Sequence, residues 1–129
     1  IVELSSGRPF TIYLGKDNNY DTSAFNDRPN LIGPPTEANP FGVFGVPPEG
    51  SIGSLGRNTG VRPGYASLDL RLTRSVFLTD KVRLDAIFEM FNSFNRVNVS
   101  DVSNGFLTAG QPTAAFDPRQ IQLALKLIF

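Results

Sequence analysis

The sequence contains no cysteine and no histidine among its 129 residues. Without cysteine, the chain has neither a disulfide framework nor a metal site built on thiolates. Without histidine, it has no serine–histidine–aspartate triad, no histidine zinc site and no histidine general base. These absences are a heavy handicap for an enzyme, although carboxylate chemistry would remain open. We therefore expect a protein that is not an enzyme and that has no cofactor and no metal site.

Net charge and long apolar runs are absent as well. The 12 Lys and Arg residues balance the 12 Asp and Glu residues, so no basic excess indicates a nucleic-acid partner. No apolar stretch reaches the about 18 residues that a transmembrane helix needs. The opening IVELSSGRPF lacks the basic start and apolar core of a signal peptide, and it lacks an initiator Met. We expect the chain to be the C-terminal fragment of a longer protein.

Apolar and polar residues alternate in four parts of the chain, which is typical of β-strands. These segments are residues 2–14, 65–78, 82–94 and 119–129. The third segment contains helix-forming residues, but its alternation continues smoothly from Val82, which favours a strand. The 12 glycines and 10 prolines favour turns over long helices. The pattern predicts an all-β protein with about four antiparallel strands.

The connections between these segments differ greatly in length. Residues 15–64 and 95–118 form long loops, whereas residues 79–81 form a tight turn. Structureless loops of more than about 12–15 residues are uncommon in compact soluble domains. Transmembrane β-barrels combine long outer loops, short periplasmic turns and strands of about 9–11 residues. We therefore predict an antiparallel transmembrane β-barrel segment in the bacterial outer membrane, with both long loops outside the cell. A soluble cell-surface β-sandwich that binds ligands is the alternative.

A three-residue turn between the second and third segments sets the predicted register of that hairpin. It places Leu72 opposite Phe88 on the apolar face, and Arg71 opposite Glu89 as an ion pair facing the barrel lumen. Such a cross-strand pair contributes about 0.2–1 kcal/mol. A two-residue turn would set apolar residues against polar ones, and we discount it. Arg74 falls on the apolar face, where it can snorkel to the membrane interface or be shifted by a β-bulge.

Three motifs resemble those of a known family and occur in that family's order. They are SGRPFT at residues 6–11, GSLGRNTGVRPGYASLDLRLTRSVFLTDKVRLDAIFEMFNSFNRVN at 53–98, and DPRQIQLALKLIF at 117–129. The set resembles the C-terminal end of TonB-dependent outer-membrane receptors, closest to the Oar-like group, which often carries a carboxypeptidase-regulatory-like domain. The resemblance implies a 22-stranded barrel closed by a plug, and transport driven through TonB. Residues 1–129 would then be the C-terminal part of one barrel domain, with the plug and the earlier strands absent.

The resemblance also implies a set of partners. These are outer-membrane lipid, the remainder of the barrel and its plug, the barrel-assembly machinery, and TonB through the N-terminal part that this chain lacks. A third hypothesis is an outer-membrane barrel that does not transport, such as an adhesin or a surface-assembly protein.

The last strand resembles the assembly signal of outer-membrane barrels, which ends in an aromatic residue after alternating apolar residues. The resemblance assigns recognition by the assembly machinery and contact with lipid to Leu123, Leu125, Leu127 and Phe129. The alternative interpretation is an ordinary amphipathic strand.

Aromatic and basic side chains in the long loops are candidate ligand-binding residues. They are Tyr20, Phe41, Phe44 and Arg57, with Phe25 and Arg62 as further members. Such aromatic rings bind sugars or peptides, or they pack the loop against itself, and the sequence leaves both interpretations open.

Two groups of acidic residues have ordinary explanations. The run DNNYD at residues 17–21 is similar to a calcium loop, but Thr22 and Arg28 stand where an EF-hand has glycine and an acid. A flexible polar loop explains it better. The carboxylates of the second and third segments alternate with basic residues, which predicts a salt-bridged lumen wall rather than a catalytic set. The residues of this wall are Asp69, Asp85, Glu89, Arg71, Arg83 and Lys126.

Overall fold

The computed structural model describes residues 1–37 and 39–129, and these residues form β-strands, turns and loops without any helix. The described residues therefore include no helix that could cross a membrane. The chain divides into two compact units. We call Ile1–Ser5, Tyr65–Asn98 and Phe116–Phe129 the sheet unit, and Ser6–Gly64 with Val99–Ala115 the loop unit. The predicted all-β class is confirmed.

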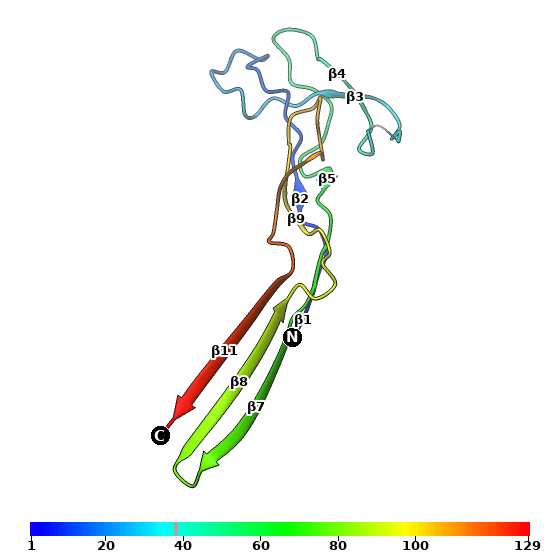
Figure 1. Ribbon diagram of the computed structural model, residues 1–129. Coiled ribbons are helices and arrows are strands. Elements are labelled where there is room, and N and C mark those ends of the chain that lie inside the picture. The colour runs from blue at the N-terminus through cyan, green and yellow to red at the C-terminus, as the bar shows by residue number, and fades with distance from the viewer. Residues whose placement is uncertain (38) are drawn as a thin grey trace. The chain divides into compact units, whose positions relative to one another are not determined.

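Three long strands dominate the sheet unit. They are β7 (Leu70–Thr79), β8 (Val82–Phe91) and β11 (Gln120–Ile128). They run antiparallel in the order β11-β8-β7, and Figure 1 shows them side by side. Their 9 to 10 residues match the length that a tilted strand needs to cross a bilayer. Within the described chain, the outer edges of β7 and β11 have no neighbouring strand, so this sheet does not close into a barrel.

The register between β7 and β8 is the predicted one, but the turn is not. Leu72 lies opposite Phe88, and Arg71 lies opposite Glu89. Thr79 pairs with Val82, so the turn contains two residues instead of three. A β-bulge between Phe77 and Thr79 adds one residue to β7, which keeps apolar residues opposite apolar ones despite the shorter turn. The prediction of a three-residue turn was therefore wrong because it did not include this bulge.

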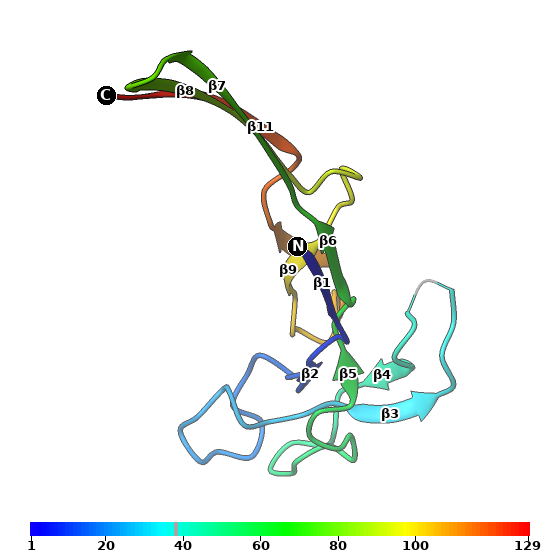
Figure 2. The same ribbon diagram turned by 90° about the horizontal axis from the view of Figure 1, so that it is seen from below.

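The segment predicted as one strand over residues 65–78 is two strands. β6 (Tyr65–Leu68) precedes β7 and pairs with β1 (Val2–Ser5), as Figure 2 shows. The residue between β6 and β7 is Asp69, whose carboxylate accepts hydrogen bonds from the backbone N–H of Asn92 and from the hydroxyl of Ser67, both at 2.9 Å. A side chain thus takes the place of a backbone partner and interrupts the strand at this point.

The segment predicted as a strand over residues 2–14 is also broken. β1 ends at Ser5, and the next strand is β2 (Pro9–Phe10) in the loop unit. Pro9 has no N–H to donate to a sheet. The backbone of Gly7 passes so close to Arg62 that a Cβ at Gly7 would lie 1.6 Å from the Arg62 carbonyl oxygen. Only glycine permits this approach, and the long alternation seen in the sequence therefore does not make one strand.

The third predicted strand ends earlier than expected. β8 stops at Phe91, whereas the prediction ran to residue 94. Asn92 has a φ of 48°, in the left-handed region that asparagine tolerates better than most residues. The side chain of Asn92 then donates to the backbone oxygen of Arg96 at 2.9 Å, which holds the chain in a turn. The last predicted strand, 119–129, agrees with β11 to within one residue at each end.

The two long connections are not structureless. They contain two small pairs of strands, β3 (Asn30–Gly33) with β4 (Val43–Gly45) and β9 (Val99–Val102) with β10 (Pro112–Ala115). A further short strand in the first connection, β5 (Gly60–Val61), pairs with β2, which precedes that connection. The sequence predicted two long loops without their internal structure, and the structure shows that these segments bury apolar side chains against each other.

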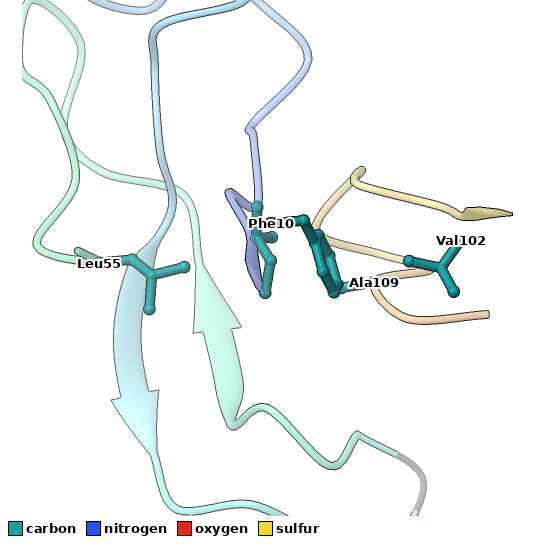
Figure 3. Close-up of a cluster of buried hydrophobic side chains, with 5 residues drawn as sticks. Phe10, Leu55, Val102 and Ala109 are labelled. Carbon is teal, nitrogen blue, oxygen red and sulfur yellow. The ribbon is translucent and has the colours of Figure 1, made fainter. Parts of the chain in front are cut away.

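The loop unit has a hydrophobic core of its own, formed by Phe10, Ile12, Leu55, Val102 and Ala109. Figure 3 shows Phe10 and Ala109 next to each other between Leu55 and Val102, which come from different parts of the sequence. The rings of Phe10 and Phe41 meet edge to face, with centroids 5.5 Å apart. This core gives the loop unit a fixed shape on which a binding site can be built.

Candidate functional site

One face of the three-stranded sheet is apolar and exposed. Leu72, Phe88 and Leu123 form one row across the strands in register, and Leu125 lies on the same face. Leu123 is 79% exposed and Leu125 is 75% exposed. Because Ala86 is small, the face is hollowed at its centre into an open apolar groove of about 560 Å³. Leucines displayed in this way to water would be a liability, whereas they suit contact with lipid.

The opposite face of the same sheet holds charged residues that pair both across strands and within β8. The Arg71 Nη1 and Glu89 Oε1 atoms lie 3.3 Å apart. Arg83 pairs with Asp85 at 3.1 Å, and Lys126 lies opposite Asp85 in register. Asp85 is only 8% exposed. The expected ion pair between Arg71 and Glu89 is thus present, while the assignment of this face to a barrel lumen stays a prediction.

Arg74 lies on the apolar face of the sheet. It is opposite Ala86 in regular register, because the bulge in β7 begins only after Phe77. Arg74 therefore lines the apolar groove together with Leu125. The alternative in which a bulge moves Arg74 to the charged face was wrong, and snorkelling along the groove is the explanation that remains.

The four predicted assembly-signal residues occupy the end of β11. Leu123, Leu125 and Leu127 lie on the apolar face opposite Phe88, Ala86 and Leu84. Phe129 follows the last residue of β11 and is 95% exposed. Recognition of these residues by an assembly machinery stays a prediction.

The structure separates the predicted ligand residues of the loops. Phe41 and Phe44 pack against the core of the loop unit. Of the two interpretations left open for these rings, ligand binding or packing within the loop, the structure shows packing. Tyr20 is exposed, and its hydroxyl donates to Glu49 at 3.3 Å. The negative charge of Glu49 raises the pKa of Tyr20 above its usual value. Arg62 is held by Asp101 at 2.8 Å.

Arg57 lines a polar pocket of about 290 Å³ in the loop unit. The pocket brings together side chains from three parts of the sequence: Thr11, Tyr13, Phe25, Asn26, Arg28, Arg57 and Asn58. The backbone N–H of Asn58 donates to Thr11 Oγ1 at 3.0 Å, which joins two of these parts. Buried Arg28 Nε and Asn26 Oδ1 have no hydrogen-bond partner within the described residues. The sequence analysis singled out Arg57 and Phe25 but missed Arg28 and both asparagines as pocket residues.

The acidic loop after Gly15 folds on itself. Asp17 accepts backbone N–H groups from Asp21 at 3.1 Å and from Thr22 at 2.8 Å. Thr22 has a φ of 73°, a conformation that glycine usually supplies. In the part of the chain that the structure describes, no three acidic, histidine or cysteine side chains gather as a metal site. Arg28, at the position where an EF-hand has its last acid, lines the polar pocket instead.

A buried carboxylate fixes this loop and was not anticipated. Asp27 is fully buried, and its Oδ2 accepts the backbone N–H groups of Asn18, at 2.5 Å, and Asn19, at 3.1 Å. The Asn18 side chain in turn donates to the carbonyl oxygens of Pro48 at 2.8 Å and Ser51 at 2.9 Å. Only the tertiary structure reveals this role, because aspartate and asparagine in a polar segment usually indicate an exposed turn.

Comparison with known proteins agrees with the exposed apolar sheet. The family model for the outer membrane beta barrel domain matches residues 1–122. The match includes the loop unit and most of the sheet unit, and it ends before Leu123 in the last strand. No curated protein and no solved structure matches the chain. The chain therefore belongs to the outer membrane beta barrel domain family and lies in the bacterial outer membrane.

Proposed function

We propose that this chain forms the C-terminal barrel wall of a TonB-dependent outer-membrane transporter, with the loop unit as its ligand-capturing part outside the cell. The observation that supports transport best is the loop unit itself. Its two segments, distant in sequence, share one hydrophobic core, and the first of them, Ser6–Gly64, carries a polar pocket. A barrel that served only as an anchor would not need a folded ligand pocket in its outer loops.

The proposed orientation follows from the antiparallel strands and the two kinds of connection. The turn at Asp80 and Lys81 lies in the periplasm, and the loop unit lies outside. The sheet contributes a wall whose apolar face contacts lipid and whose charged face lines the lumen. The plug, the remaining strands and the TonB contact are supplied by other parts of the protein. This chain performs no catalysis; its part is to form the wall, to hold the ligand and to support assembly.

The orientation can be tested with single cysteines, because the chain has none of its own. Glu37→Cys in the loop unit and Lys81→Cys in the turn are introduced separately into the full-length protein. We expect a membrane-impermeant maleimide to label Glu37→Cys on intact cells and Lys81→Cys only after the outer membrane is permeabilised. Labelling of Lys81→Cys on intact cells would contradict the orientation.

Transport is tested by capture of the full-length protein on the immobilised periplasmic domain of TonB. We expect specific capture that a peptide copying the protein's own TonB-contact segment competes away. Failure of capture by a folded, detergent-solubilised protein would leave a non-transporting outer-membrane barrel as the function.

The assembly part of the proposal concerns Phe129. We expect Phe129→Ser to slow insertion and to lower the amount of protein in the outer membrane, with unchanged ligand affinity per folded molecule. The measurement is heat-modifiable migration on gels over time after induction. Ile128→Ser is the matched control, because Ile128 precedes Phe129 on the charged face opposite Arg83. Insertion of Phe129→Ser at the normal rate would show that this residue is no assembly signal.

A further inference from the structure

We propose that the polar pocket of the loop unit binds a small organic anion with hydroxyl groups, held through its carboxylate or phosphate by Arg28 and Arg57. This inference rests on the proposed function and deepens it by giving a chemical class to the ligand. Arg28 and Arg57 both belong to the lining of one pocket of about 290 Å³. That volume is at the lower end of the range for small-molecule sites, which suits a ligand the size of a monosaccharide.

The charge of the pocket favours an anion. Two arginines line it, and none of its lining residues is an aspartate or a glutamate. Within the described chain, Arg28 and Arg57 form no ion pair, whereas Arg62 of the same unit is neutralised by Asp101 at 2.8 Å. A guanidinium that is free of a protein partner offers paired N–H donors that match the two oxygens of a carboxylate or phosphate.

Unsatisfied polar atoms provide a second reason. Arg28 Nε is buried without a hydrogen-bond partner, and so is Asn26 Oδ1. Buried polar atoms in proteins normally have a hydrogen-bond partner, so atoms without one are unfavourable. Both atoms are covered by neighbouring side chains, so a hydroxylated anion would satisfy them once those side chains shift. Phe25, which is 81% exposed, adds an aromatic ring on which the apolar face of a sugar ring can pack.

The pocket is built on fixed parts of the loop unit. Thr11 lies between Phe10 and Ile12, which are both in the hydrophobic core. Arg28 lies between Asp27 and Pro29, which are both fully buried, and its carbonyl oxygen accepts the N–H of Gly53 at 3.0 Å. Its backbone is therefore held in place before any ligand arrives. A preformed site loses less conformational entropy on binding than a flexible loop.

The test uses the full-length receptor in detergent and isothermal titration with three probes: galacturonate, galactose 6-phosphate and galactose. We expect at least one of the two anions to bind, and neutral galactose to bind at least tenfold more weakly than it. A preference for one anion identifies the carboxylate or the phosphate as the recognised group. Arg28→Gln and Arg57→Gln should each weaken anion binding about tenfold or more.

Arg8→Gln is the matched control, because it removes the same charge from an exposed residue of the loop unit outside the pocket. This substitution should leave the affinity for the anion within about twofold of the wild-type value. Arg28→Lys keeps the positive charge but loses the planar pair of N–H donors. Its affinity for the anion should lie between those of wild type and Arg28→Gln. Heat-modifiable migration checks that each variant is folded, so that loss of affinity is not loss of structure.

Three results would overturn the proposal: no anion binding at millimolar concentration, equal binding of galactose, or unchanged affinity in both glutamine variants. None of these depends on TonB. Capture by TonB should be the same for wild type, Arg28→Gln and Arg57→Gln, since the substitutions lie in the ligand pocket. Anion binding without TonB capture would refute transport and leave the pocket intact, and the reverse result would refute the pocket alone.

Discussion

The sheet unit and the loop unit place their apolar residues in opposite ways. In the sheet unit, Leu123 and Leu125 are exposed, while Asp85 on the other face is buried. In the loop unit, Phe10 and Ile12 are buried in the usual manner of a water-soluble fold. In the orientation proposed above, the same hydrophobic effect produces both results, because the apolar sheet face would contact hydrocarbon and the loop unit would contact water. The comparison teaches that exposure has to be judged against the solvent of each unit.

The largest expected effect comes from shortening one apolar side chain in each unit, which tests the difference between the two units directly. Ile12→Ala should destabilise the loop unit by about 2–5 kcal/mol, because it leaves a cavity in a packed core. Leu125→Ala on the sheet should cost about 1–2 kcal/mol, the loss of apolar transfer alone, because lipid refills the space and leaves no cavity. Unfolding by urea in lipid vesicles, followed by near-ultraviolet circular dichroism and hydrogen exchange, measures both. Equal losses would show that Leu125 packs against protein instead of lipid.

The next largest effect concerns a charge placed on the two sheet faces. Leu123→Arg should destabilise the membrane-inserted protein by about 2–4 kcal/mol, because arginine in the hydrocarbon layer is costly. Its neighbour Gln122 lies on the opposite face beside Glu89, so Gln122→Arg should change stability little. The measurement is again urea unfolding in vesicles. A larger loss for Gln122→Arg would reverse the assignment of the faces.

A smaller effect of opposite sign is expected at Arg74. Arg74→Leu should stabilise the inserted protein by about 1–2 kcal/mol, because it removes the one basic residue that lines the apolar groove. Arg71→Leu, on the charged face, is the control and should be destabilising because Glu89 loses its partner at 3.3 Å. Destabilisation by Arg74→Leu would indicate a polar partner for Arg74 in the assembled barrel.

The smallest effect is a local pH dependence in the loop unit. Hydrogen bonds from the side chains of Asn19 and Asn26 hold the pKa of Asp21 below its ordinary value. The stabilising contribution is therefore present above the ordinary pKa of aspartate, near 4, and is lost as pH falls through the lowered value. We expect amide exchange at Ser23 to quicken in that acidic range, measured by NMR, and Asp21→Asn to remove the dependence. Faster exchange as pH rises towards neutrality, after correction for intrinsic exchange, would contradict the sign.

Sequence reasoning succeeded where neighbouring residues decide the structure. The alternation in β7 and β8 predicted the pairing of Leu72 with Phe88 and of Arg71 with Glu89, because a shift by one residue would turn every side chain to the wrong face. It failed at Asp69 and Gly7, where one side chain or one close backbone contact interrupts an apparently continuous strand. These contacts join residues distant in sequence, and no local pattern reports them.

The candidate pocket shows the same limit. Arg57 and Phe25 were identifiable as residue types that bind ligands, but Arg28 and Asn26 resembled an ordinary polar turn. The pocket exists only because the segments around residues 11, 26 and 57 meet over one core. Even the two candidates Phe41 and Phe44 turned out to contribute to that core.

By itself, the sequence determined which face of each long strand is apolar, because side chains alternate with a period of two whatever the surroundings. It also determined the all-β class and the outer-membrane setting of the alternating strands. The tertiary structure alone decided where the strands break, that the two long connections fold as one unit, and which residues line a common pocket. The physical reason is range: alternation is a property of adjacent residues, whereas a core and a pocket arise when distant segments exclude water together.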